Sequence, residues 1–242
     1  MAGLNLWRRA RRFGTIADMN STADSVGVAH FGSGYPAEPV VARLAGQAGI
    51  QKVPSPALTL FIKRDFIDAA LCEALVARID AERRPSTVSD FNGDALFRTS
   101  ETCDFRDDEP LTQTINQRIS GLMGLDPRHG ETLQGQRYGV GQEFKAHTDY
   151  FDPLGVDWER FCGVSGQRTW TAMIYLNAPD AGGTTRFKEI DKIVKPETGK
   201  LLMWNNLRPD GSGNPATLHH GMKVRAGAKY VLTKWFRERP WV

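Results

Sequence analysis

Residues 136–151 have the sequence QRYGVGQEFKAHTDYF, and the triplet His147-Thr148-Asp149 near its end decides what we expect of the fold and the site. β-prone residues around the triplet predict a strand over residues 143–150. Alternate side chains of a strand share a face, so His147 and Asp149 point the same way. One imidazole and one carboxylate on one face offer two ligands to a metal ion. A single HxD pattern also fits an ordinary His–Asp hydrogen bond, so a third ligand has to be found.

The adjacent pair His219 and His220 offers that third ligand. As strand neighbours they point to opposite faces, so we expect only one of them to take part. Two histidines and one carboxylate leave the other face of a metal open. That arrangement is typical of non-haem Fe(II) oxygenases, although it also suits a catalytic zinc ion.

Lys229 begins a predicted strand over residues 229–237, in which Val231, Thr233 and Trp235 share its face. A lysine that points into a barrel is costly unless an anion meets it. A bound dicarboxylate would meet that need. A solvated lysine at the strand end is the alternative.

The composition predicts a soluble globular protein rather than a nucleic-acid or membrane protein. The chain has 242 residues, 40% of them apolar, with 31 basic and 28 acidic side chains. Four arginines lie within the first twelve residues, which leaves the remainder nearly neutral. Three cysteines without CxxC spacing favour a reducing compartment, and no apolar segment follows the basic start as in a secretory signal. We therefore expect a cytoplasmic protein.

The segment pattern predicts a mainly β protein with supporting N-terminal helices (α+β). We expect residues 1–50 to form a partly irregular arm, residues 51–130 a helical support region of the same domain, and residues 131–242 the catalytic core. Helices are predicted from Asp68 and over Leu111–Met123. Short strands between turn signals predict a sandwich or barrel: 57–62, 132–138, 143–150, 168–177, 185–187, 200–204, 217–224 and 229–237.

Several segments in this order resemble the 2-oxoglutarate- and Fe(II)-dependent oxygenases, in particular their prolyl 4-hydroxylase-like branch. The resemblance covers about residues 57–237 and implies a double-stranded β-helix (jelly-roll) core. The segments that carry it are Arg98–Ser100 (RTS), residues 136–151, Gly182–Phe187 (GGTTRF), Gly199–Trp204 (GKLLMW), Leu218-His219, Gly227–Tyr230 (GAKY) and Thr233–Trp235 (TKW).

The resemblance also implies roles for individual residues. His147, Asp149 and His219 would bind Fe(II); His219 is preferred because the family's lysine follows its metal histidine by ten residues, as Lys229 does here. The co-substrate 2-oxoglutarate would be bound by Lys229, Tyr138 and Thr185, and the substrate by Arg168, Phe144 and Trp158. No catalytic residue beyond the metal centre is implied. Ordinary structural roles are the alternatives: a core tyrosine, a strand threonine, a surface salt bridge of Arg168, and a loop anchor in Trp158.

The implied reaction consumes O₂ and 2-oxoglutarate, hydroxylates a C–H bond and releases succinate and CO₂, with ascorbate as a reductant for the iron. The implied substrate is a prolyl residue of a peptide or protein, as for a procollagen-proline 4-dioxygenase. Phe144, Ala146, Thr148 and Lys223 depart from the family pattern. Phe144 and the long connection over residues 151–167 keep a free amino acid or another small metabolite open as substrate. A non-enzymatic β-barrel binding module is the alternative from another class. We expect no nucleic-acid or membrane partner, and the oligomeric state stays open.

Overall fold

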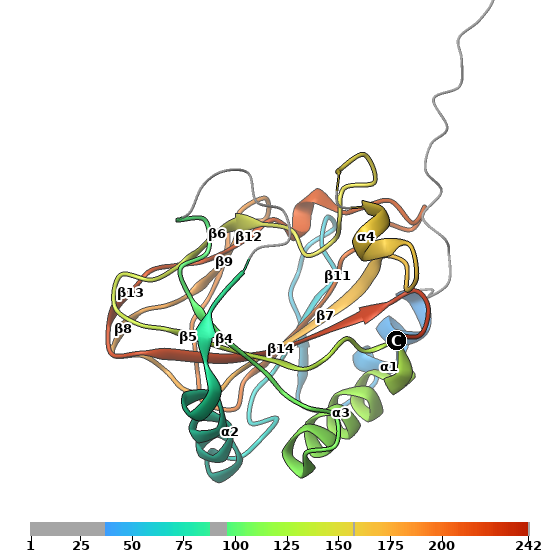
Figure 1. The fold of residues 1–242 in the computed structure, drawn as a ribbon. Helices are drawn as coiled ribbons and strands as arrows, with labels where there is room; N and C mark the ends of the chain where they lie inside the picture. The colour runs from blue at the N-terminus through green and yellow to red at the C-terminus, as the bar shows by residue number, and fades with distance from the viewer. Residues whose placement is uncertain (1–36, 88–95, 157, 242) are drawn as a thin grey trace, which may run out of the picture.

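A computed structural model describes residues 37–87, 96–156 and 158–241 (Figure 1). The arginine-rich start of the expected N-terminal arm lies outside the described residues. The description begins with helix α1 (Ala37–Ala45), which buries Val40 and Leu44.

The larger of two main sheets has eight strands, and every pair of neighbours in it is antiparallel. From one edge to the other, these strands are β1 (Ile50–Lys52), β2 (Leu60–Lys63), β11 (Leu201–Asn205), β7 (Arg168–Tyr175), β14 (Lys229–Arg237), β5 (Gln134–Tyr138), β4 (Glu101–Asp104) and β3 (Arg84–Pro85). The order differs from the chain order, so neighbours in space come from distant parts of the sequence.

The smaller main sheet has four strands, in the order β10 (Lys192–Val194), β9 (Thr185–Phe187), β12 (His219–Gly221) and β6 (Phe144–His147). Strands β8 (Ala181–Gly182) and β13 (Val224–Ala226) form a separate pair. A cluster of buried side chains from both main sheets, including Phe187, Leu202 and Val231, fills the space between them. Two antiparallel sheets closed over one core form a double-stranded β-helix, which confirms the expected fold class.

Helices α2 (Ala69–Glu82) and α3 (Pro110–Met123) lie on the outer side of the large sheet (Figure 1). The Asp68 carboxylate accepts a hydrogen bond from Leu71 N and caps α2, as the sequence predicts. Helix α3 ends at Gly124, whose φ of 71° is the left-handed conformation that glycine adopts without strain. The remaining helical elements are α4 (Trp158–Cys162) and the short 3₁₀ turns η1 (Pro127–His129) and η2 (Pro215–Thr217).

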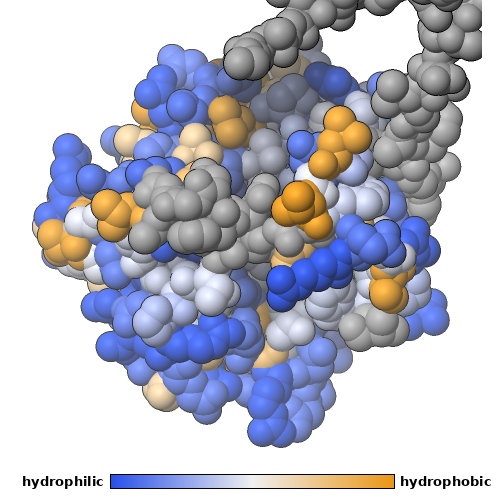
Figure 2. Space-filling model, turned by 45° about the horizontal axis from the view of Figure 1, so that its top comes forward, coloured by the Kyte–Doolittle hydropathy of each residue, from blue (hydrophilic) through white to orange (hydrophobic). Residues whose placement is uncertain are grey.

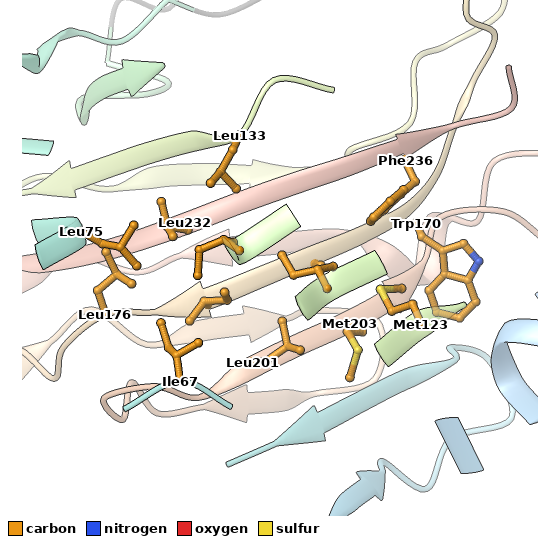
Figure 3. Packing of buried hydrophobic residues seen from close by; sticks show 14 of the residues in the cluster. Ile67, Leu75, Met123, Leu133, Trp170, Leu176, Leu201, Met203, Leu232 and Phe236 are labelled. Carbon is orange, nitrogen blue, oxygen red and sulfur yellow. The ribbon is translucent and has the colours of Figure 1, made fainter. Parts of the chain in front are cut away.

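The central strands are covered on both faces. Along β11, Leu201 and Met203 face the helices, whereas Leu202 and Trp204 face the smaller sheet. All nine residues of β14 are buried. Figure 3 shows the helix side of this core, where side chains of β7, β11 and β14 meet Leu75 of α2 and Met123 of α3. Each fully buried aliphatic or aromatic side chain contributes about 1.5–3 kcal/mol, so this packing holds the strands in fixed register.

Most expected strands are confirmed, but the strand expected over residues 143–150 ends at His147, and the short strands β1, β3, β4, β8 and β10 were not predicted. Residues 217–224 form no single strand, because Asn214 caps the turn η2 and the chain then contributes β12 and β13 separately. Strand β4 was not predicted, because the sequence ETCD lacks apolar alternation. Together with β2, it extends the large sheet with strands from residues 51–130, while the division into three regions stays a prediction. Within the described ranges, no helix has the length and apolar character needed to cross a membrane.

Candidate metal centre and co-substrate pocket

Strand pairing brings His147 and His219 together. Strands β6 and β12 are antiparallel neighbours, and these two residues lie opposite each other in their register. Their ring centres are 4.2 Å apart. The strand pairing shifts register between His219 and Gly221, so the ladder is irregular beside the site.

Asp149 completes the cluster from the segment that follows β6. Its Oδ1 lies 3.8 Å from Nε2 of His147, and potential ligand atoms of Asp149, His147 and His219 all lie within 4.8 Å of one another. In the part of the chain that the structure describes, no other group of three or more His, Cys, Asp or Glu residues has this proximity. His220, the other candidate for the third ligand, instead pairs with Glu143: its Nε2 lies 2.9 Å from Glu143 Oε2.

The hydrogen bonds of the two histidines leave Nε2 free in both rings. Nδ1 of His147 donates to the carbonyl of Lys145 at 2.7 Å, and Nδ1 of His219 donates to the carbonyl of Thr217 at 2.9 Å. A carbonyl only accepts, so Nδ1 carries the proton in the neutral ring. Burial, reinforced by the proximity of His219, holds the pKa of His147 well below its usual value. The donor set therefore fits a divalent metal that takes imidazole and carboxylate ligands, Fe(II) included.

Aromatic side chains enclose the two rings. Phe144 stacks on His147 with ring centres 3.5 Å apart, and the Arg98 guanidinium lies 5.0 Å from the centre of the Phe144 ring. On the other side, Trp204 packs edge-on against His219 at 5.0 Å. These contacts restrict the rotamers of both histidines, so the ligand geometry is set by packing as well as by hydrogen bonds.

Lys229 is buried and lacks an anionic partner among the described residues. Its Nζ lies 5.1 Å from the ring centre of Tyr138 and 5.4 Å from that of Tyr175. Burial lowers the pKa of Lys229 to about 7. A carboxylate placed beside Nζ would restore the charged form, so the position fits an acidic ligand.

One cavity joins the candidate metal ligands to Lys229. Tyr138, Thr185 and Phe144, which the sequence resemblance placed at the site, also line it. Thr185 accepts a hydrogen bond from the Tyr175 hydroxyl at 2.6 Å. The sequence analysis did not assign the other lining residues a role: Gln136, Met173, Trp204, Gly221, Val231, Thr233 and Trp235. The sequence could have assigned Val231, Thr233 and Trp235 to this cavity, because they share the face of β14 that carries Lys229.

Two predicted substrate residues lie outside the lining of this cavity. Arg168 binds both carboxylate oxygens of Glu131, at 2.6 and 2.8 Å, and its guanidinium lies 4.0 Å from the ring centre of Trp235. Burial opposes ionisation of Glu131, but Arg168 and Arg237 lower its pKa below the usual value. Trp158 is the half-buried first residue of α4. Their contact with substrate stays a prediction, and the salt bridge of Arg168 is buried rather than on the surface.

A larger cavity, of about 760 Å³, lies between α1 and η2. Its charged lining residues are Glu38, Glu189 and Arg208, and it contains none of the candidate metal ligands. The smaller cavity is therefore the candidate site on chemical grounds.

The sequence around this site is similar to known proteins. Residues 133–237 match the family model described as the 2OG-Fe(II) oxygenase superfamily. This matched segment contains the three candidate metal ligands and Lys229.

The named relatives are prolyl hydroxylases. The chain is 37% identical to prolyl 4-hydroxylase subunit alpha-1 of Gallus gallus over 132 residues, which are 54% of this chain and 25% of that protein. It thus spans about a quarter of the length of this curated relative.

Solved structures share the fold. The viral collagen prolyl hydroxylase of Paramecium Bursaria Chlorella virus-1 matches with a TM-score of 0.57 at 23% identity, over 80% of this chain and 98% of that chain. A Trichoplax adhaerens prolyl hydroxylase in complex with a hypoxia inducible factor peptide fragment matches with a TM-score of 0.55 at 15% identity, over 84% and 89% of the two chains.

Proposed function

We propose that this protein is an Fe(II)- and 2-oxoglutarate-dependent dioxygenase that hydroxylates a prolyl residue of a peptide or protein. The observation that carries the proposal is one cavity lined by two histidines, one aspartate and a buried lysine that has no anionic partner among the described residues. A site that binds a chelating dicarboxylate needs a metal to take one end of it and a cation to pair with the other, and this cavity offers ligands for the first and Lys229 for the second. A binding module without catalysis would not need open metal positions beside a buried cation.

In this proposal His147, Asp149 and His219 hold Fe(II), which supplies the oxidising chemistry when it is bound together with 2-oxoglutarate and O₂. Lys229 pairs with the carboxylate of 2-oxoglutarate that lies farthest from the metal. Tyr138 and Thr185 offer hydroxyl groups along the same cavity. The resemblance that suggests these roles also suggests ascorbate as reductant for the iron, and we include it in the proposal.

The apolar part of the cavity wall would exclude water from the reacting centre. Phe144, Met173, Trp204 and Val231 line it beside the ligand atoms. A dry cavity strengthens the pairing of Lys229 with a carboxylate and protects a reactive intermediate from side reactions. These residues therefore orient and shield the reactants rather than exchange protons with them.

The choice of a peptidyl substrate rests on the relatives. The curated relative is named for prolyl 4-hydroxylation, and a structural neighbour is described with a bound peptide fragment. The exposed face turned toward the viewer in Figure 2 is mainly hydrophilic, with hydrophobic residues scattered outside the grey atoms. A free amino acid is the second candidate substrate, because Phe144 lacks the hydroxyl that a tyrosine would present beside His147.

We also propose a cytoplasmic location. Cys72, Cys103 and Cys162 are all free and buried. Thiols persist in reducing compartments, which supports this location.

Succinate formation from 2-oxoglutarate tests the function directly. The purified protein is incubated with Fe(II) and ascorbate in three reactions: without substrate, with a proline-rich peptide, and with free L-proline. We expect the peptide to stimulate succinate formation and to gain the mass of one oxygen atom, and the variant His147→Ala to remove both effects. Stimulation by free proline alone would mean that the substrate is a small metabolite rather than a peptide. Iron binding without consumption of 2-oxoglutarate would overturn the role of Lys229.

A further inference from the structure

The two carboxylate oxygens of Asp149 lie in different surroundings. Oδ1 lies toward the histidines, 3.8 Å from Nε2 of His147. Oδ2 accepts a hydrogen bond of 2.7 Å from the hydroxyl of Thr171, in the middle of β7. Among the described residues, Thr171 is the only side-chain hydrogen-bond donor to this carboxylate, so it alone distinguishes the two oxygens.

A second hydrogen bond orients the Thr171 hydroxyl. Nδ2 of Asn206 donates to Thr171 Oγ1 at 2.9 Å, and both side chains are fully buried. An amide NH₂ only donates, so the threonine oxygen is the acceptor and its own proton is directed to Asp149. The hydrogen bonds therefore run in one direction, from Asn206 through Thr171 to Asp149 Oδ2.

The backbone holds this chain of hydrogen bonds in place. Thr171 lies opposite Trp204 in the β7–β11 pairing, and Asn206 directly follows β11, with its backbone N–H bonded to the carbonyl of Thr169. The donors thus come from the rigid centre of the large sheet, whereas Asp149 lies in an irregular segment after β6. A ligand on such a segment depends on its partners for its orientation.

We propose that Thr171 and Asn206 are positioning residues that present only Oδ1 of Asp149 to the metal. With Oδ2 held by Thr171, the carboxylate would offer one oxygen to the metal, which would leave room on the metal for 2-oxoglutarate and O₂. The inference rests on the metal site of the proposed function. It assigns the two residues no contact with metal or substrate.

The test measures metal affinity rather than turnover. Anaerobic calorimetric titration with Fe(II), and the visible absorption of the Co(II)-loaded protein, are compared for the wild type and variants. Thr171→Val keeps the shape of the side chain and removes the hydroxyl, and we expect it to weaken binding about 10- to 100-fold, as the loss of an outer-shell partner does. We also expect its Co(II) spectrum to change. Thr171→Ser keeps the hydroxyl and should restore wild-type affinity and spectrum.

Thr169→Val is the matched control. Thr169 is buried on the same face of β7, and its hydroxyl donates to the carbonyl of Phe236 at 3.1 Å, away from the ligands. The Thr169→Val variant loses a buried hydrogen bond comparable to the one lost in Thr171→Val. We therefore expect a similar loss of folding stability in both variants, with unchanged metal affinity in Thr169→Val. Equal effects of the two valine substitutions on affinity would mean that Thr171 acts only through stability.

Asn206→Leu tests the second link, and it also tests the proposal if Thr171→Val does not fold. We expect about a three- to tenfold loss of affinity, the equivalent of one neutral hydrogen bond. Because Asn206 acts through Thr171, the substitution should add no further loss in the Thr171→Val background. Additive losses would overturn the directed chain. Absence of metal binding by the wild type would instead overturn the metal site itself, and wild-type affinity in Thr171→Val would overturn only the positioning role.

Discussion

The imidazole rings of His147 and His219 lie 4.2 Å apart because the pairing of β6 with β12 places these residues opposite each other. Each ring donates through Nδ1 to a backbone carbonyl two residues earlier in the chain. The same local arrangement thus occurs on two strands and directs both Nε2 atoms into the cavity. This relationship makes the metal site largely preformed.

Substitution of the ligands should separate His219 from its neighbour His220. We expect His147→Ala, Asp149→Ala and His219→Ala each to weaken Fe(II) binding by more than the roughly 10- to 100-fold cost of losing an outer-shell partner. His220→Ala is the control, because this ring pairs with Glu143 outside the ligand cluster. Calorimetric titration with Fe(II) under nitrogen provides the measurement. Retained affinity in His219→Ala would make the assigned ligand set wrong.

The binding of 2-oxoglutarate should weaken as the pH rises through neutrality. Burial lowers the pKa of Lys229 to about 7 in the free protein, so the ammonium form is lost above that pH. Pairing with a carboxylate raises the pKa again, so binding takes up a proton. We expect a Kd that is nearly constant below about pH 7 and rises about tenfold per pH unit above it.

Titration of the Mn(II)-loaded protein with 2-oxoglutarate between about pH 6 and 9 measures this dependence. The Lys229→Met variant should bind 2-oxoglutarate weakly at every pH, and its Kd should not rise above about pH 7 as that of the wild type does. In Lys229→Arg the side chain stays charged across this range, so the Kd for 2-oxoglutarate should not change with pH. A wild-type Kd that does not change across the range would argue against Lys229 as the partner of the carboxylate.

Glu131 should be important for stability, because its single negative charge lies between the guanidinium groups of Arg168 and Arg237. Arg168 binds it through two nitrogens, and Nε of Arg237 lies 2.6 Å from its Oε1. Glu131→Gln leaves this positive charge unpaired, and we expect a loss of about 3–5 kcal/mol in the free energy of unfolding. Urea denaturation measures the loss. Asp108→Asn removes an exposed ion pair with Arg106 and should change little.

Lys234 should lower the stability of the folded protein at neutral pH. Its side chain is 2% exposed and packs against Gly130, and burial lowers its pKa from 10.5 to about 8. The unfolded chain therefore binds the proton more tightly, at a cost to folding of about 3 kcal/mol below pH 8. The cost falls as the pH rises from 8 toward 10.5, so this group makes the wild type more stable with rising pH.

Lys234→Met keeps much of the volume and removes the charge. We expect it to raise the free energy of unfolding at pH 7 by about 1–3 kcal/mol. The gain should be smaller at about pH 9.5, because burial of the lysine destabilises the wild type less at that pH. Urea denaturation at the two pH values measures both effects. A destabilised variant at pH 7 would show that the ammonium group has a favourable role in the fold.

The sequence by itself determined what depends on local periodicity. The alternation of a strand places Val231, Thr233 and Trp235 on the face of Lys229. The same alternation predicted one face for His147 and Asp149, but β6 ends at His147, so Asp149 reaches the site from the segment after the strand. The capping aspartate and the four-residue spacing of apolar residues predicted α2, and similar spacing predicted α3. In each case the signal lies within one segment, so no knowledge of distant partners was needed.

Only the tertiary structure decided which segments meet. Periodicity states the face of a residue within its own strand, but not the strand that lies beside it or the register of the pair. The position of His219 opposite His147, the pairing of Arg168 with Glu131, and the hydrogen bonds from Asn206 through Thr171 to Asp149 all depend on such pairings. Strand β4 went unpredicted for the same reason, since its partners β3 and β5, rather than its own composition, make it a strand.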